Sequence, residues 1–258
     1  MGTGDVRLLG RVEAGLAFTA YRQGDYPASR AAATRALRLG EQAGDFRVVG
    51  SALNYLSNCE LADGDVEKAR RLLVQATEAY RVEGNNRGIG VTLINLADVA
   101  IRAAEYTKAV ELAVEAIVLL RPFGPTVINV ALLNLATACV QLDRLEEAED
   151  HARESLQLAG DTADMVGVCC GLRVFAAVAA RRGDGERAGR LLGAAERIRT
   201  EIDLSLEPSE AVLQADLVGR LEKLLSSDDR SKALSEGKAL SGEAAVEYAL
   251  AARAMPPA

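Results

Sequence analysis

Residues 56–77 read LSNCELADGDVEKARRLLVQAT, and this stretch contains the pattern that decides the fold. Four other stretches follow the same pattern: LAFTAYRQGDYPASRAAATRAL from Leu16, LADVAIRAAEYTKAVELAVEAI from Leu96, LATACVQLDRLEEAEDHARESL from Leu135 and FAAVAARRGDGERAGRLLGAAE from Phe175. Consecutive stretches start 39 or 40 residues apart. A repeat of this length with a turn at its centre is typical of stacked helical hairpins.

Small residues recur at fixed positions within the five stretches. Each stretch begins with a large apolar residue and a small one, and two more small residues follow later in the second half. The first of these later positions holds Ser29, Ala69, Ala109, Ala148 and Ala188, and the second holds Ala36, Ala76, Ala116, Ser155 and Ala195. Small residues allow two helices to approach closely, so this register predicts an all-α chain of packed hairpins.

Turn residues mark both ends of the predicted helices, about every 20 residues. The positions are Gly24, Gly44, Gly64, Gly84, Gly124, Gly160 and Gly183, with Ala104 and Asp143 at the two places that lack glycine. Gly-Asp or Gly-Asn pairs predict the joints between hairpins, because glycine can end one helix and the next residue can cap another. The pairs are Gly44-Asp45, Gly84-Asn85 and Gly160-Asp161, and the segment from Pro122 to Pro125 predicts a more rigid joint of the same kind.

The repeats predict a domain over residues 10–203, divided at about 10–44, 45–84, 85–124, 125–160 and 161–203. Residues 204–258 predict a C-terminal helical cap with a frayed end from Met255, because a stack of repeats needs a terminal element with a polar outer face. In this cap we expect a helix that starts at Glu207-Pro208-Ser209 and a polar break, SSDDR, from Ser226. Two short helices are then expected at Ser231–Gly237 and Ser241–Arg253.

Composition and charge argue against several classes of function. The net charge is −7, so the chain lacks the basic face that direct nucleic-acid binding requires. No apolar run reaches the roughly 18 residues of a membrane-spanning helix, and the first residues lack a signal-peptide core. We therefore expect a cytoplasmic protein that contacts neither nucleic acid nor membrane.

Catalytic and metal-binding chemistry is also poorly represented. The single histidine, His151, lies in the charged run EAEDHARES, where an exposed surface residue is the expected role. The four cysteines, Cys59, Cys139, Cys169 and Cys170, show no CxxC spacing and are expected to be small packed residues. The sequence thus predicts no catalytic residue, no metal site, no cofactor and no enzymatic activity.

The leucine–small pair, the Gly-Asp turn and the two later small positions resemble the tetratricopeptide repeat in its longer form of about 40 residues. The resemblance covers roughly Arg11 to Asp203, although the early tryptophan of that family is missing. It implies a right-handed superhelical α-solenoid of about five hairpins, in which the first helix of each hairpin lines a concave surface.

The tail resembles a second group of proteins. The stretches RLLGAAERIRTEIDLSLEPSE from Arg190 and ALSEGKALSGEAAVEYAL from Ala233 look like the C-terminal end of MalT-like and LuxR-type bacterial ATPase regulators. The sequence contains neither their phosphate-binding loop GxxxxGK[ST] nor a basic recognition helix. The resemblance therefore implies that this chain corresponds to the sensor arm of such a regulator.

The concave surface that the resemblance implies would carry the candidate binding residues. They are polar side chains of the first helices, with apolar neighbours such as Phe18 and Tyr21: Asn54, Asn58, Asn95, Asp98, Arg102, Asn134, Arg173 and Arg181. A row of asparagine amides can hold an extended peptide backbone, since each amide both donates and accepts hydrogen bonds. The same asparagines could instead bond to a neighbouring repeat and stabilise the stack, and the sequence leaves both roles open.

The leading prediction is a non-enzymatic repeat module that binds a protein, a peptide or a small effector as the sensor or scaffold arm of a bacterial transcriptional regulator. The alternative is a free-standing adaptor that assembles protein partners and has no connection with transcription. The identity of the partner and the oligomeric state do not follow from the sequence.

Overall fold

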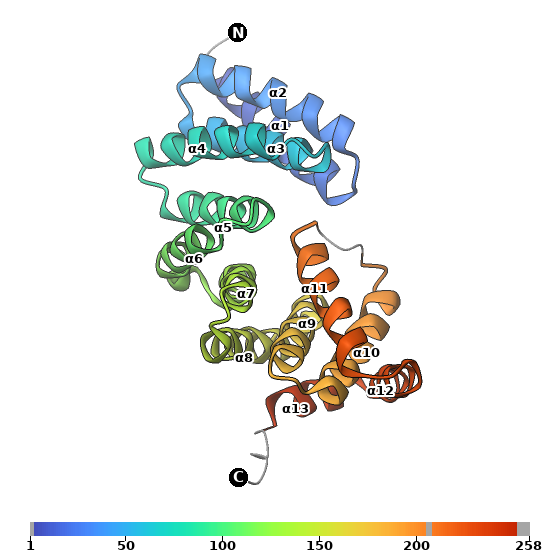
Figure 1. Ribbon diagram of the computed structural model, residues 1–258. Coiled ribbons are helices and arrows are strands. Elements are labelled where there is room, and N and C mark those ends of the chain that lie inside the picture. The colour runs from blue at the N-terminus through green and yellow to red at the C-terminus, as the bar shows by residue number, and fades with distance from the viewer. Residues whose placement is uncertain (1–2, 205–207, 252–258) are drawn as a thin grey trace. The chain divides into compact units, whose positions relative to one another are not determined.

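The computed structural model describes residues 3–204 and 208–251, and these residues form thirteen α-helices and one short 3-10 helix (Figure 1). The first six α-helices are α1 (Thr3–Arg22), α2 (Tyr26–Ala43), α3 (Phe46–Ala62), α4 (Val66–Val82), α5 (Asn86–Arg102) and α6 (Tyr106–Leu120), and η1 (Arg121–Phe123) follows. The next four are α7 (Pro125–Gln141), α8 (Leu145–Asp161), α9 (Met165–Arg181) and α10 (Gly185–Glu201). The last three are α11 (Pro208–Leu224), α12 (Ser227–Lys238) and α13 (Gly242–Leu250). The predicted all-α class is confirmed.

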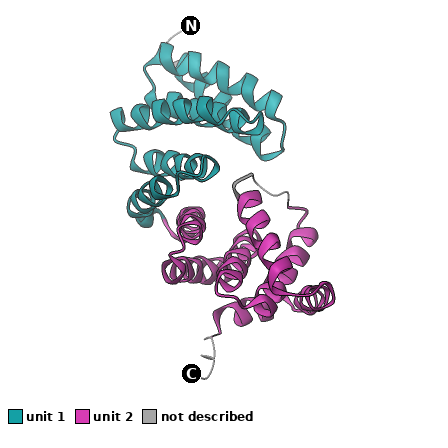
Figure 2. Cartoon of the chain, in the orientation of Figure 1, with its two compact units in different colours: residues 1–123 teal, residues 124–258 magenta. Residues whose placement is uncertain are grey.

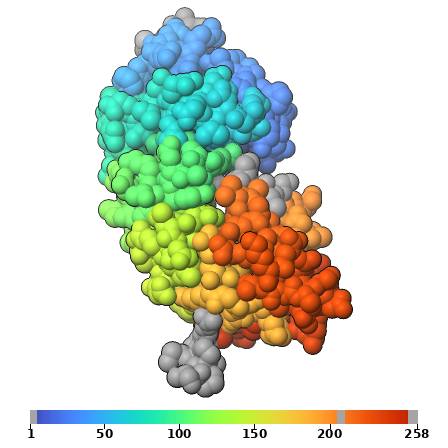
Figure 3. Space-filling view, in the orientation of Figure 1, coloured from blue at the N-terminus to red at the C-terminus, as the bar shows by residue number. Residues whose placement is uncertain are grey.

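The chain divides into two compact units, residues 1–123 and 124–258 (Figure 2). In the first unit α1–α2, α3–α4 and α5–α6 pack as hairpins, and α2 packs against α3 and α4 against α5. The hairpins of this unit follow one another as layers from blue to green (Figure 3). In the second unit α7–α8 and α9–α10 form hairpins, and α8 packs against α9. The boundary predicted near residue 203, between the repeats and the C-terminal cap, differs from this division at residue 123 and stays a prediction.

The small residues of the repeat lie where the helices are most closely packed. All ten residues at the two later small positions have no exposed surface, from Ser29 and Ala36 in α2 to Ala188 and Ala195 in α10. The two hydroxyl groups among them are satisfied, since Ser29 donates to the Ala17 carbonyl at 2.9 Å and Ser155 to the Asn129 Oδ1 at 2.6 Å. The register of small residues therefore sets the close approach of the helices.

The turns have a left-handed backbone at nearly constant spacing. Positive φ occurs in the described residues at Gly24, Gly44, Gly64, Gly84, Ala104, Gly124, Asp143, Ala163, Gly183 and Asp203. Ala104 and Asp143, which the sequence placed at turns, thus adopt a glycine-like, left-handed backbone. Only glycine adopts this conformation without steric cost, so at these two turns the surrounding helices must enforce it.

The joint predicted at Gly160-Asp161 is wrong. Helix α8 continues through both residues, and the left-handed turn residue is Ala163, with φ 53°. Asp164 then caps α9, because its carboxylate accepts the Gly167 N–H at 3.1 Å. Capping explains the correction, since the residue before a helix needs a side-chain acceptor and Asp164 supplies it in the same way as Asp45 does for α3.

The tail also differs from its prediction in one place. The SSDDR segment is the start of α12, because the Ser226 hydroxyl accepts the Asp229 N–H at 3.1 Å and caps the helix. The two aspartates lie in its first turn, where negative charge is favourable. Ser241 caps α13 as expected, and that helix ends at Leu250. The predicted helix end at Arg253, the frayed end from Met255 and the start at Glu207 lie outside the described residues.

Candidate functional site

The first helices of the first unit, α1, α3 and α5, contact one another in order. Five of the eight predicted binding residues lie on two of them, and we call these five the polar row: Asn54 and Asn58 on α3, and Asn95, Asp98 and Arg102 on α5. The structure thus places the polar row within one compact unit.

Two members of the polar row are bonded across the α3–α5 boundary. Asn54 is buried, and its Oδ1 accepts a hydrogen bond from the Asn95 Nδ2 at 2.8 Å. Asp98 and Arg102 form an ion pair at 2.9 Å along α5. The Asn54–Asn95 bond joins adjacent repeats, which is the stacking role that the sequence left open for Asn95.

Asn58 differs from these neighbours. It lies one turn of α3 beyond Asn54 and is half-buried, and its side-chain amide makes no hydrogen bond with any other described residue. An amide that is partly exposed and has no protein partner retains its capacity to donate and to accept. Asn58 is therefore the residue of the polar row best placed to contact a ligand.

An aromatic cluster is formed by Phe18 and Tyr21 on α1, Tyr55 on α3 and Tyr26 at the start of α2. The ring centroid of Tyr55 lies 6.1 Å from that of Phe18 and 6.3 Å from that of Tyr21, and the ring centroids of Tyr21 and Tyr26 are 6.2 Å apart. Phe18 is 49% exposed, and burial raises the pKa of Tyr55 to about 12, so the phenol stays neutral. Phe18 and Tyr21 were expected here from the sequence but Tyr55 was not, although it lies 40 residues before Asn95 and so holds the same position of the repeat.

The remaining predicted site residues belong to the second unit. Asn134 is half-buried on α7. Arg173, only 2% exposed, donates from Nη2 to the Glu210 carbonyl at 3.1 Å, and its Nη1 lies 3.7 Å from the Glu210 carboxylate. Arg181 pairs with Asp216 at 3.1 Å and donates to Gln141 at 3.2 Å. Both arginines thus bind carboxylates of α11, and the chain's own tail occupies the positions that the sequence assigned to a ligand.

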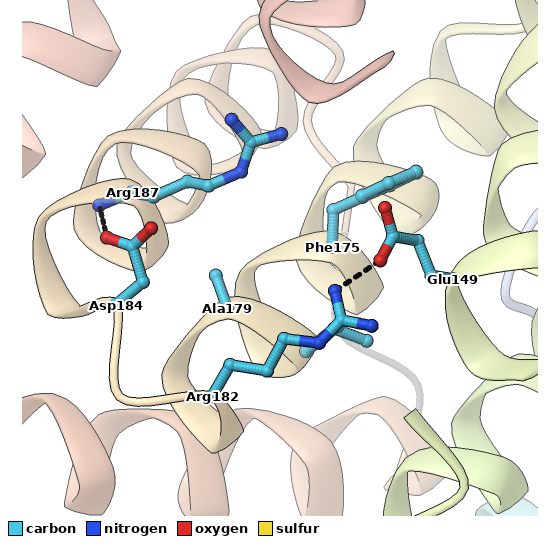
Figure 4. Close-up of a pocket in the computed structure, with 7 residues that line it drawn as sticks. Glu149, Phe175, Ala179, Arg182, Asp184 and Arg187 are labelled. Carbon is cyan, nitrogen blue, oxygen red and sulfur yellow. Dashed lines mark hydrogen bonds and ion pairs between the residues drawn. The ribbon is translucent and has the colours of Figure 1, made fainter. Parts of the chain in front are cut away.

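A pocket in the second unit was not anticipated from the sequence. Its lining comes from α8, α9, α10 and the turn between the last two: Glu149, Phe175, Val178, Ala179, Arg182, Asp184 and Arg187. Figure 4 shows Glu149 and Arg182 joined by an ion pair, and Asp184 accepts the Arg187 backbone N–H at 3.1 Å. The Arg187 guanidinium donates to the carbonyls of Tyr248 and Ala249, at 3.1 and 2.9 Å. The Arg187 side chain on this pocket thus holds the C-terminal end of α13.

His151 and the cysteines are the groups that could support catalysis or metal binding. His151 is half-buried on α8, where an exposed position was expected. Cys59, Cys139 and Cys169 are buried and unbridged, as expected, and burial raises the pKa of Cys169 to about 11. Residues 3–204 and 208–251 contain no group of three or more side chains that could hold a metal ion. Within the same described ranges, no helix is both long and apolar enough to cross a membrane.

A buried carboxylate connects three helices of the first unit. Glu60 on α3 is 5% exposed, pairs with Arg30 of α2 and lies 3.1 Å from the Lys68 Nζ of α4. Burial by itself would raise the pKa of Glu60, but the hydrogen bonds from Arg30 and Lys68 outweigh it and lower the pKa below the ordinary value.

Replacing this carboxylate gives a pH-dependent prediction. Glu60→Gln is expected to lower the free energy of unfolding at pH 7 by about 1–3 kcal/mol, because charge-assisted hydrogen bonds are lost. The folded-state pKa is below the unfolded one, so the contribution is present above the unfolded pKa and disappears as pH falls through the folded pKa. Urea unfolding from pH 7 to pH 3 checks this, and a difference between variant and wild type that is independent of pH would contradict it.

Comparison with known proteins gives one family match and several structural matches. The family described as "MalT-like TPR region" matches residues 10–227. No curated protein sequence matches the chain.

Among solved structures, BtubC (BKLC) from P. vanneervenii is similar over 78% of this chain and 84% of that chain, with 17% identity and a TM-score of 0.63. A putative kinesin light chain with nearly identical TPR-like repeats from Podosopora anserina is similar over 80% of this chain and 100% of that chain, with 16% identity and a TM-score of 0.59. A tetratricopeptide repeat protein from Parabacteroides merdae is similar over 95% of this chain and 100% of that chain, with 13% identity and a TM-score of 0.50. At these identities the matches concern the fold alone, and they confirm the tetratricopeptide architecture.

Proposed function

Because the chain belongs to the family of MalT-like TPR regions, we propose that it is a non-enzymatic module that binds a protein or peptide on the first-helix face of its first unit. The observation that carries this proposal is that α1, α3 and α5 carry both the polar row and three of the four aromatic residues, Phe18, Tyr21 and Tyr55. The half-buried amide of Asn58 can bond to a peptide backbone, and the exposed ring of Phe18 can cover an apolar side chain.

The candidate residues of the two units have different roles in this proposal. Arg173 and Arg181 bind α11, and Asn54 and Asn95 bind each other, so these four stabilise the stack. Asn58 and Phe18 supply the contacts to the partner, with the Asp98–Arg102 pair beside them. Asn134 is half-buried on α7 and remains a further candidate for contact.

We place this module in the bacterial cytoplasm, as the sensor or scaffold arm of a transcriptional regulator of the MalT-like and LuxR-type kind. The family match and the resemblance of the tail support this role. If the chain is part of such a regulator, coding sequence for a phosphate-binding loop or a helix-turn-helix module is expected next to the segment that encodes it. Isolated start and stop signals around it would favour a free-standing adaptor instead.

Two asparagine variants separate binding from stacking. Asn58→Ala is expected to reduce capture of partner proteins from a lysate of the source organism at least tenfold, with a change in unfolding free energy below about 0.5 kcal/mol. Asn95→Ala is expected to cost about 1–3 kcal/mol, because it removes the donor to the buried Asn54 amide.

The two measurements are affinity capture with quantitative mass spectrometry and urea unfolding of the purified chain. Val74→Ala is the matched control for capture, since Val74 is 56% exposed on the second helix α4. Undiminished capture by Asn58→Ala would argue against binding on this face.

A further inference from the structure

Helix α1 exposes an apolar face that the proposed binding role does not use. We call it the open stacking face: Leu8, Leu9, Val12 and Leu16, which are 64%, 40%, 50% and 51% exposed. On a helix, residues with these spacings lie along one side. A contiguous apolar face of this kind marks a contact with another surface.

The repeat register shows what covers the equivalent face elsewhere. Forty residues later, α3 carries Val48, Val49, Ala52 and Leu56, and all four are at most 9% exposed. The positions in α5 are Gly88, Ile89, Thr92 and Leu96, and they are buried too. The face is therefore closed in both later repeats of the unit and open only in its first.

The second helix of the preceding hairpin closes the face in α3. Val48 and Ala52 form one buried cluster with Ala36 of α2. A Cβ added at Gly40 of α2 would lie 3.0 Å from the Val48 Cγ1 and 3.1 Å from the Val49 Cγ2. Small residues of α2 thus admit the branched side chains of α3.

The sequence before the open stacking face has the form of a joint between hairpins. Gly4-Asp5-Val6-Arg7-Leu8-Leu9-Gly10 repeats Gly44-Asp45-Phe46-Arg47-Val48-Val49-Gly50 in the same register. In the interior, Gly44 has a φ of 62° and the Asp45 carboxylate caps α3. At the first joint the same two residue types lie inside α1, which begins at Thr3.

We propose that the open stacking face binds the second helix of a further hairpin of the same repeat type, in the way that α3 binds α2. The partner helix presents small residues toward Leu8, Leu9 and Leu16, as Ala36 and Gly40 do toward α3. Val12 stands where the later repeats of the unit have Ala52 and Thr92, so the partner must be smallest opposite this residue. This binding continues the α2–α3 and α4–α5 interfaces by one step and is independent of the polar row.

The test is a graft in the existing register. A copy of residues 45–83 is joined directly to Gly4 of the full chain, which places a second α4 before α1 as α4 stands before α5. The variant Val12→Cys reports the exposure of this position by its labelling with iodoacetamide, which mass spectrometry measures for each peptide separately. We expect labelling of this cysteine to fall at least tenfold in the graft, with Val74→Cys unchanged because Val74 stays exposed.

Two controls and a measurement of the oligomeric state make the outcome decisive. Leu9→Asp in the graft should restore labelling, and a second graft of residues 5–43 in the same register should give the same protection as the first. Unchanged labelling of Val12→Cys in both grafts would overturn the proposal. A dimer of the unmodified chain that sedimentation detects and Leu9→Asp dissolves would overturn it too, because the occupant would then be a second copy.

Discussion

Replacing Gly237 by alanine is expected to lower the free energy of unfolding of the second unit by about 3 kcal/mol. Gly237 lies on α12 where this helix packs on α10, and a Cβ atom there would overlap the carbonyl oxygen of Arg190. A Cβ atom at Gly193 of α10 would likewise overlap the carbonyl of Leu234. Both obstacles are backbone, so the helices themselves must move apart and lose their contact.

Urea unfolding followed by circular dichroism measures this effect, and hydrogen exchange shows whether α12 opens first. Gly219→Ala is the matched control, because Gly219 is also helical and a Cβ atom there meets nothing within 4 Å. That variant should gain about 0.5–1 kcal/mol from the better helix propensity of alanine. Equal stability of the two variants would mean that α10 and α12 do not approach as closely as the structure shows.

Replacing Glu210 by alanine is expected to cost about 2–3 kcal/mol, because it takes the carboxylate away from the buried guanidinium of Arg173, which keeps only its bond to the backbone carbonyl of residue 210. Arg173 is 2% exposed, and Glu210 also accepts a hydrogen bond from the Cys170 thiol at 2.8 Å. Helix α11 should then be held in place mainly by its own buried leucines, Leu213, Leu217 and Leu221.

A double-mutant cycle identifies the cause of that loss. Arg173→Met removes the buried charge together with its need for a partner, so the double variant Arg173→Met/Glu210→Ala should lose less than the sum of the two single variants. Strict additivity in urea unfolding would show that the pair is not coupled and that the cost of Glu210→Ala comes from another contact.

The repeat period predicted most of the fold because its signals are local. A small residue such as Ala148 must lie in a helix contact whatever follows it, and a glycine such as Gly64 can end a helix by its own conformation. The error at Gly160 arose because the cap, Asp164, decides where the next helix starts, and the glycine does not. The SSDDR segment was misread for the same reason, since Ser226 is a cap as well as a polar residue.

The candidate site was less predictable because its contacts join distant parts of the chain. The sequence placed Arg173 and Arg181 on first helices but gave no sign that α11 would return to cover them with Glu210 and Asp216. The Asn54–Asn95 bond was hidden because the two residues occupy different positions of the repeat, 41 residues apart. Only the three-dimensional packing shows that the amides of Asn54 and Asn95 bond to each other. It also shows that the amide of Asn58 has no partner among the described residues.

Site-specific photo-crosslinking in cells of the source organism tests most directly whether a partner binds the first-helix face of the first unit. A benzophenone amino acid replaces Asn58 on α3 in one protein and Val74 on α4 in another, and Phe18→Ala is combined with the first. We predict a discrete crosslinked protein or peptide from position 58, reduced by Phe18→Ala, and no corresponding product from position 74. The same product from position 74 alone, or from position 58 undiminished by Phe18→Ala, would contradict this account.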